Sequence, residues 1–472
     1  MTLSYFKAKL YRITSLGYHM INQLDLHGGS FKAVLPYTFW GWFAWVISAI
    51  IAFAGLLLGL SGGQGSGAMF ILSAVGFLCL SFCTPGSHEG DLHKVRMQAA
   101  DPAEIEAKAK ASGLTVDNWW LQQTTYIPTN DPSDWILPAP GPATWDESNR
   151  YGPHGDGTAI AEHPSKVGTP VPATFSLFGI FASFSALLTI FGLWSFISAE
   201  KELGTAEGDQ MYIIIGVIVL GLILTFLGYL KSKMIAQMID TPTSMVRSVS
   251  VGINELVGQV RPAPEGVLTV VVDGNSNMVM TNMAAFKWTY EQYQCRTVKD
   301  SEGNSKEECH WVTIRSDTGG CPFILHDGTG GIRVNPHSFK RDDWGQYLKR
   351  WDGSFAQTLG KQVMSQAIAG LLGGGKVKKH RWTLYGLRLG NPVYLIGNVK
   401  PRDKADFTAE GLDGTLQNSI VEVFGKEDSP GTKVIIQRGS ELSNLGRSRS
   451  GVELVIVPMI LVLGGISLLG LA

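Results

Sequence analysis

The sequence predicts an α-helical multi-pass membrane protein, with about five transmembrane helices, that also carries a β-rich domain. Three observations lead to this fold class. Of the 472 residues, 45% are hydrophobic and only 17% are charged, whereas soluble domains average about 25% charged residues. Long apolar runs without any charge alternate with polar stretches. Residues 245–440 alternate β-branched and aromatic segments with Gly-rich turns, as a small barrel or sandwich does.

The charge balance narrows the classes of partner. The 39 basic and 40 acidic side chains nearly cancel, so the chain creates no global field that would attract a polyanion. Its apolar content excludes a disordered chain. We therefore expect no nucleic-acid partner, and we expect the lipid bilayer to be the main one.

Five apolar runs are the expected membrane spans. They are Trp40–Leu60 and Ala68–Cys83 in a hairpin over 36–83, Phe175–Ile197 and Tyr212–Leu230 in a hairpin over 175–230, and Leu454–Ala472 in a C-terminal helix over 454–472. A bilayer core of roughly 30 Å requires about 20 helical residues. The run Ala68–Cys83 is the short one, and it needs its flanks or a thinner bilayer to span.

The N-terminal residues 1–35 carry apolar side chains at helical spacing, namely Phe6, Leu10, Ile13, Leu16 and Met20. This spacing predicts an amphipathic helix, either in the membrane interface or covering the transmembrane bundle.

Basic residues beside the spans predict the orientation. If all five runs span, one side collects Lys32, Lys94, Arg96, Lys231, Lys233, Arg247, Arg447 and Arg449. The loop over 200–209 on the other side has one lysine and four acidic residues. Because short basic flanks stay in the cytoplasm, we expect 84–174 and 231–453 to be cytoplasmic, at the inner or plasma membrane if the source is prokaryotic.

Residues 84–174 form a long loop rich in Pro and Trp, with one helix predicted at 101–111. Its tryptophans are expected to pack on the β-rich domain or on a partner. The loop also holds four histidines, His88, His93, His154 and His163. Their spacing matches no metal-ligand pattern, so we predict no metal site and no cofactor.

The β-rich domain spans 231–453. Lys287–Arg296 and His310–Arg315 flank a polar turn and should form a long hairpin. An amphipathic stretch over 344–372 that ends in three glycines predicts a helical insertion.

This domain resembles the GIDE-type domain of membrane-anchored mitochondrial ubiquitin ligases, which also occurs in prokaryotic membrane proteins. The resemblance lies in Thr241–Ser248, Gly252–Gly258, Pro322–Gly330 and Gly390–Gly397. It implies a β-domain next to a membrane helix. The ligases also carry a zinc-binding RING, but this sequence has no paired Cys-x-x-Cys ligands, so the resemblance does not imply ligase activity.

Three groups of residues stand out in the domain. If Tyr293 pairs with Trp311, Cys295 faces Cys309, and the pair is either a disulfide in an oxidising compartment or two reduced thiols. The basic run Lys376, Lys378, Lys379 and Arg381 could contact anionic lipid or simply be solvated.

The third group is the turn Asp327-Gly328-Thr329-Gly330. A lone carboxylate of this kind lacks the partner that an aspartic protease requires, so a structural turn is expected.

These features favour a non-enzymatic membrane scaffold or interaction protein, as a homo-oligomer or in a larger membrane assembly. No catalytic motif is present in the sequence. The alternatives are a membrane-associated enzyme or ligase accessory that acts with a separate catalytic chain and, third, a transporter. No apolar run has an ionisable residue at its centre, which disfavours transport.

Overall fold

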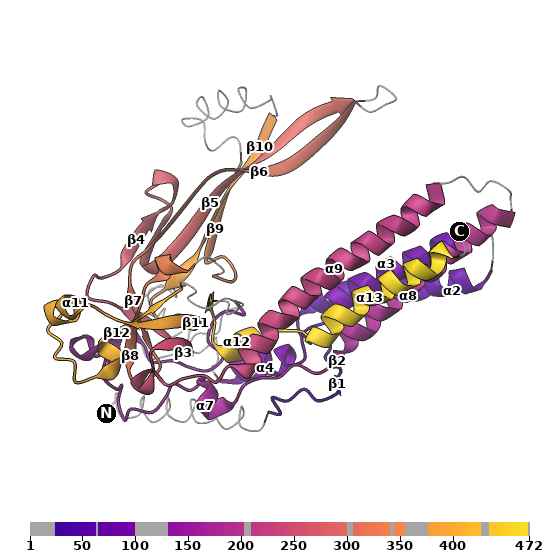
Figure 1. Ribbon diagram of the computed structural model, residues 1–472. Coiled ribbons are helices and arrows are strands. Elements are labelled where there is room, and N and C mark those ends of the chain that lie inside the picture. Colours follow the sequence, from indigo (N-terminus) through magenta and orange to yellow (C-terminus); the bar gives the residue numbers. More distant parts are fainter. Residues whose placement is uncertain are drawn as a thin grey trace. The chain divides into compact units, whose positions relative to one another are not determined.

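The computed structural model describes residues 24–62, 65–99, 131–202, 209–299, 305–339, 344–354, 376–425 and 434–470 (Figure 1). The chain divides into two compact units. The helical unit comprises residues 1–102, 166–242 and 441–472, and the β unit comprises residues 103–165 and 243–440. Both units are therefore built from segments that are distant in the sequence.

In the part of the helical unit that the structure describes there are five long helices. They are α2 (Phe39–Leu60), α3 (Ser66–Phe82), α8 (Leu177–Glu202), α9 (Asp209–Asp240) and α13 (Gly451–Leu469). Among the described residues, α2, α8, α9 and α13 are long and apolar enough to cross a bilayer, whereas α3 has only 17 residues. The membrane-embedded character expected from the apolar runs is thus supported for four helices, and a span by α3 stays a prediction.

Small residues bring the helices together. Neighbours touch in the order α2, α3, α8, α13 and α9. A Cβ added at Gly76 of α3 would lie 2.5 Å from the backbone nitrogen of Ala52 in α2, and Ser73 Oγ donates a 2.6 Å hydrogen bond to the Ala52 carbonyl. Close packing and interhelical hydrogen bonds drive the association of helices in lipid. The hydrophobic effect does not contribute there, because lipid tails are as apolar as the side chains.

A buried carboxylate joins the start of α13 to the start of α8. The Glu453 side chain accepts hydrogen bonds from the backbone N–H and the hydroxyl of Ser176, the latter at 2.8 Å, and from the N–H of Gly179 at 3.2 Å. These donors lie at the N-terminal end of α8, where unpaired N–H groups and the helix dipole favour a negative charge. Glu453 therefore caps a helix distant in sequence.

The chain before α2 is extended. β1 (Phe31–Lys32) pairs in parallel with β2 (Phe175–Ser176), and Gly29 has a φ of +66°, which interrupts a helix. The helix expected over 1–35 is therefore wrong for 24–35, while 1–23 lie outside the described residues. Helix α4 (Glu89–Ala99) was not predicted. The helix expected at 101–111 lies outside the described residues.

The β unit contains a closed five-stranded barrel. Its strands are β3 (Gly252–Pro262), β7 (Phe323–His326), β8 (Gly331–Val334), β11 (Pro392–Pro401) and β12 (Val421–Phe424), and β13 (Ile435–Arg438) pairs with β11 outside the ring. Around the barrel the order is β3, β7, β8, β12, β11, and only β8 and β12 are parallel. This is the strand order of an OB-type Greek-key barrel. Of the two architectures expected, the barrel is the one formed.

A second sheet is built from insertions between barrel strands. β4 (Leu268–Val271), β5 (Val279–Lys299) and β6 (Ser305–Gly320) come between β3 and β7, and β9 (Lys349–Ser354) and β10 (Lys376–Arg388) come between β8 and β11. β5 pairs with β4 and β6 along one edge and with β10 along the other. Figure 1 shows β5, β6 and β10 extending together as a long ribbon.

One predicted helix is a strand in part. The helical insertion expected over 344–372 is wrong for 349–354, where β9 pairs with β10 and Trp351 lies opposite Trp382. Cross-strand aromatic pairs of this kind stabilise a sheet and override the helical spacing. Residues 355–372 lie outside the described residues.

Short elements complete the described chain. They are the helices α7 (Pro164–Val167), α11 (Lys404–Ala409) and α12 (Glu441–Leu445), and the 3-10 turns η1 (Pro142–Thr144), η2 (Glu147–Asn149), η3 (Val246–Ser248), η4 (Val272–Gly274), η5 (Pro336–Ser338) and η7 (Gln417–Ser419).

The segment 131–165 packs on the barrel. Trp135 Nε1 donates a 2.7 Å hydrogen bond to the Gly390 carbonyl, and Gln259 Nε2 donates one of 2.6 Å to the Pro140 carbonyl. Trp135 is buried. Of the two surfaces expected for the tryptophans, Trp135 therefore uses the β-rich domain.

The close helix contact at Gly76 makes a testable prediction. Gly76→Ala should destabilise the helical unit by about 1–3 kcal/mol, because the added methyl group meets backbone that moves only if α2 and α3 separate. Gly216→Ala in α9 is the matched control, since a Cβ there meets no atom within 4 Å. Unfolding of the purified chain in an SDS titration measures both, and equal stability of the two variants would contradict this packing.

Candidate functional site

The predicted turn at 327–330 connects β7 and β8 and is organised by the Asp327 carboxylate. Asp327 is fully buried. Its Oδ1 accepts hydrogen bonds from Thr329 N (2.8 Å), Thr329 Oγ1 (2.7 Å) and Gly330 N (3.2 Å), and its Oδ2 accepts one from Val246 N (2.9 Å). Gly328 has a φ of +94°, which favours glycine. The carboxylate thus accepts hydrogen bonds from four donors, which hold the turn together.

A histidine and a serine lie beside this carboxylate. His163 Nε2 is 3.8 Å from Asp327 Oδ2, and Ser165 Oγ is 2.7 Å from His163 Nδ1. A nucleophilic triad requires a hydrogen bond between base and carboxylate, and 3.8 Å is too long for one. Ser165 N also donates to His163 Nδ1, at 3.2 Å. The contact between Ser165 and His163 is thus a local one at the start of α7.

His326, adjacent in sequence to Asp327, is held neutral. Its Nδ1 accepts a hydrogen bond from Gly328 N, and its Nε2 lies 3.0 Å from the Gly152 carbonyl, to which it donates. Burial, helped by the nearby Arg261 guanidinium, lowers the pKa of His326 to about 3.

Ion pairs fix the loop between β11 and β12. Arg333 on β8 pairs with Glu265, with Glu410 at 3.5 Å and with Glu422 at 3.4 Å. Arg402 pairs with Glu410 as well. This network joins strands β8 and β12 to the loop that follows β3 and to the loop between β11 and β12. Its charged groups are paired with one another.

The long hairpin forms an arm, defined here as residues 290–299 of β5 and 305–315 of β6. The register is the predicted one, because Tyr293 lies opposite Trp311 and Cys295 lies opposite Cys309. The rings of Tyr293 and Trp311 are 5.2 Å apart, and the Arg381 guanidinium of β10 lies 4.0 Å from the centre of the Trp311 ring. None of the residues of β6 is buried.

The other face of the same sheet is aromatic and buried. The Tyr290 ring lies 4.9 Å from Trp382 and 5.9 Å from His380. Tyr290 Oη is 2.8 Å from His380 Nδ1 and accepts a hydrogen bond from Gln292 Nε2 at 2.7 Å. Burial lowers the pKa of His380. These contacts make the root of the arm rigid.

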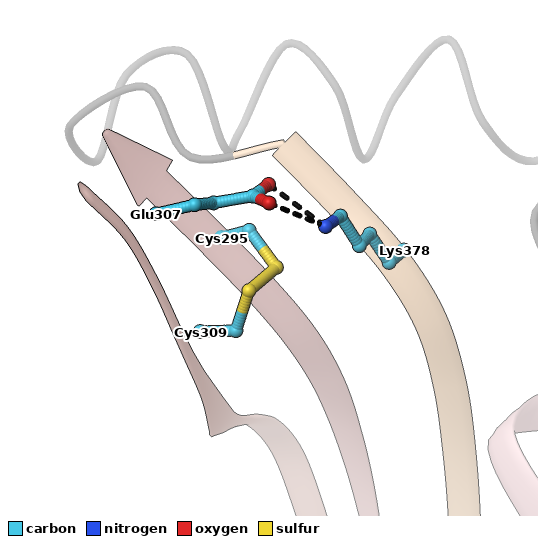
Figure 2. The surroundings of a disulfide bond; sticks show 4 residues. All are labelled: Cys295, Glu307, Cys309 and Lys378. Carbon is cyan, nitrogen blue, oxygen red and sulfur yellow. Dashed lines mark hydrogen bonds and ion pairs between the residues drawn. A yellow bond between two sulfur atoms is a disulfide. The ribbon is translucent and has the colours of Figure 1, made fainter. Parts of the chain in front are cut away.

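Cys295 and Cys309 are joined by a disulfide within the arm (Figure 2). Of the two states expected for the pair, this is the one that the structure contains. Glu307 lies beside the sulfur atoms, and both of its carboxylate oxygens are 2.8 Å from Lys378 Nζ. Cys295 is buried, Cys309 is half-buried and Glu307 is exposed.

Glu307 is a residue of this group that was not predicted from the sequence. The signal is present, because residues two apart on a strand lie on one face, and Glu307 therefore shares a face with Cys309. Glu307 was expected in the turn before the strand, whereas β6 begins at Ser305.

The predicted basic run lies along β10. Lys378 pairs with Glu307, and Arg381 Nε lies 3.3 Å from Asp352 Oδ1 while its guanidinium covers Trp311. Two of the four cations thus have protein partners. Contact of Lys376, Lys378, Lys379 and Arg381 with anionic lipid stays a prediction.

The four histidines of the 84–174 loop are divided between the units. His88 and His93 belong to the helical unit, and His154 and His163 belong to the β unit. His88 lines a cavity of about 210 Å³ together with Lys32 and Asp91. There Lys32 Nζ is 3.2 Å from Asp91 Oδ2 and 3.3 Å from His88 Nδ1.

The turn predicts a large effect of one substitution. Asp327→Ala should destabilise the β unit by about 3 kcal/mol or more, because three backbone N–H groups lose a buried acceptor. Asp413→Ala removes a similar local turn, in which Asp413 accepts from Thr415 N and Oγ1 in an exposed loop, and should change stability little. Urea unfolding followed by tryptophan fluorescence measures both, and similar losses would contradict the structural function of Asp327.

The neutral His326 predicts acid sensitivity. Its pKa is about 3 in the folded chain and about 6.5 when unfolded, so between these values only the unfolded chain binds the proton. Stability should therefore fall by about 1.4 kcal/mol for each pH unit below 6.5. His326→Gln keeps a donor and an acceptor and should reduce this slope. Unfolding midpoints from pH 7 to pH 4 provide the measurement, and an unchanged slope would contradict the assignment.

Comparison with known proteins gives these features no counterpart. No family model, no curated protein and no solved structure matches the chain. The strand order of the barrel is a likeness at the level of the fold, and one fold hosts many functions.

Proposed function

We propose that the chain is a membrane-embedded scaffold whose arm contacts a second copy of the chain or another membrane protein. The observation that carries the proposal is the arm itself. β5 has 21 residues and β6 has 16, whereas the longest barrel strand, β3, has 11; at about 3.3 Å for each residue, β5 exceeds that strand by about 33 Å. An element of this length that buries few of its side chains serves to present a surface.

The barrel closes without the arm. Its apolar core is formed by strand residues such as Leu256, Leu325, Ile332, Leu395 and Val423, and none of these belongs to the arm. The arm is rigid through backbone pairing and the stack of Arg381 on Trp311. Aromatic and arginine side chains on a rigid surface are typical of interface centres.

Chain connectivity favours a position of the β unit at the membrane surface. Residues 241–251 connect α9 to the first barrel strand, and residues 439–450 connect the last strand to α13. Connections of this length reach at most about 40 Å. Two such tethers hold the β unit near the bilayer, as the resemblance to GIDE-type domains would imply. We propose that α3 also spans, which makes five spans and places the β unit on the cytoplasmic side.

The hydrogen bonds and ion pairs of the acidic side chains in the β unit favour a scaffold over an enzyme. Asp327 has four hydrogen-bond donors, and Tyr394 Oη donates to Glu255 at 2.6 Å. Glu410 and Glu422 are paired with arginine. Carboxylates engaged in this way stabilise the fold and are poorly suited to proton transfer.

Photo-crosslinking from the arm tests the proposal. A photoreactive amino acid at the exposed Thr313 of β6 should give a discrete higher-mass adduct in intact membranes, because the arm would lie in the interface. The exposed Lys404 of α11 is the matched control position in the same unit, and it should give none. Mass spectrometry of the adduct shows whether the partner is a second copy or another protein.

Two results would contradict the scaffold. One is the absence of any adduct from Thr313 in membranes where the chain is folded. The other is equal crosslinking from Thr313 and Lys404, which would indicate random encounters.

A further inference from the structure

Three metal-ligating side chains meet on one face of the arm. The sulfur atoms of Cys295 and Cys309 and a carboxylate oxygen of Glu307 all lie within 4.8 Å of one another. They come from the paired strands β5 and β6, so the backbone register holds them together. Figure 2 shows Glu307 extending over the two sulfurs.

We propose that the reduced form of the arm binds a zinc-type divalent cation through Cys295, Cys309 and Glu307. Two thiolates and one carboxylate are ligands that Zn²⁺ accepts, with Zn–S near 2.3 Å and Zn–O near 2.0–2.2 Å. Atoms already within 4.8 Å of one another need only small side-chain rotations to reach a common ion. A water molecule would take the fourth tetrahedral position, because Glu307 lies at the exposed edge of the group.

The disulfide and the metal complex exclude each other, because they use the same two sulfur atoms. A dithiol reductant breaks the S–S bond by giving it two electrons and two protons, and the reductant becomes a disulfide itself. The two thiols formed then bind the cation and release two protons to solvent. A disulfide oxidant reverses this sequence: it takes two electrons from the two thiolates and two protons from solvent, becomes a dithiol, and the cation is released as the Cys295–Cys309 bond forms.

Lys378 fixes the position of Glu307, the third proposed metal ligand, in the disulfide form of the arm. In the disulfide form it holds both oxygens of Glu307 at 2.8 Å. In the metal form one oxygen turns to the cation, and the ammonium group balances the single negative charge that two thiolates and one carboxylate leave on a divalent ion. The compartment decides the state, since reducing compartments keep thiols reduced and oxidising ones favour disulfides. A cytoplasmic β unit would therefore hold the metal state.

The test uses the full chain in detergent with Cys79, Cys83 and Cys321 replaced by Ser, so that the two arm cysteines are its only thiols. After reduction by a phosphine and its removal under nitrogen, the protein is titrated with Co²⁺ and then with competing Zn²⁺. We expect one Co²⁺ per chain with thiolate-to-metal charge-transfer absorption, displacement by Zn²⁺, and no such binding by the oxidised protein.

Glu307→Gln distinguishes the three-ligand site from a bare thiol pair. It should weaken Zn²⁺ binding about tenfold or more, since even groups outside the coordination shell are worth that much. Glu308→Gln is the matched control, because it removes the same charge from the next residue, which points to the opposite face of β6. Circular dichroism confirms that each variant is folded.

The proposal is overturned if the reduced, folded protein binds no stoichiometric Co²⁺, or if Glu307→Gln and Glu308→Gln bind equally well. These results leave the scaffold proposal unaffected, because crosslinking from Thr313 does not depend on a metal. Failure of crosslinking would likewise leave the metal site standing.

Discussion

One buried residue, Asp327, joins three separate parts of the β unit through its carboxylate and its backbone carbonyl. Asp327 accepts hydrogen bonds within its own turn and from Val246, which precedes the first barrel strand. The backbone carbonyl of the same residue accepts a 2.6 Å hydrogen bond from Ile160 N. Burying a carboxylate is costly unless its hydrogen bonds are made. The turn is therefore stable only when all three segments are in place, which makes assembly of the β unit cooperative.

The barrel that this turn helps to close determines where the arm can emerge. Ring closure uses the parallel pair of β8 and β12, so both edges of the barrel sheet are joined. The extra strands enter between β3 and β7 and between β8 and β11. These two insertions then pair with each other through β5 and β10. The second sheet is made from two insertions. Each insertion begins and ends at a barrel strand, and this fixes the position of the sheet on the barrel.

Much of the architecture could be predicted because it depends on local patterns. Apolar runs without charges indicated the long helices, and a polar turn between two strand-like runs indicated the hairpin. The pairing of Tyr293 with Trp311, on which the position of Cys295 opposite Cys309 depended, is the one that forms. The Asp-Gly-Thr-Gly turn was also readable, since its glycine and hydrogen bonds are local. Where the sequence was misleading, distant contacts decided the structure. Strand β9 exists because β10 lies beside it, and the extended chain at 31–32 exists because 175–176 pairs with it.

The difference between local patterns and distant contacts also explains which functional residues were not predicted. Glu453 caps a helix that begins far earlier in the chain, and no pattern near Glu453 points to Ser176 or Gly179. Glu307 was expected in a polar turn, and it shares a face with Cys309 because β6 already begins at Ser305. The closed barrel was one of two expected architectures, because the pairing of β8 with β12 has no local signal.

The position of the cross-link along the arm has a physical reason. β10 begins at Lys376, which lies opposite Cys295. Beyond that register position the described part of the hairpin has two strands, from 296 to 299 and from 305 to 308. Two-stranded ribbons are marginally stable in water. A covalent or metal-mediated link beside the first described residue of β10 constrains the two-stranded part of the arm. Exchange between disulfide and metal would then keep the outer arm ordered in either redox state, and only the reduced, metal-free form would loosen it.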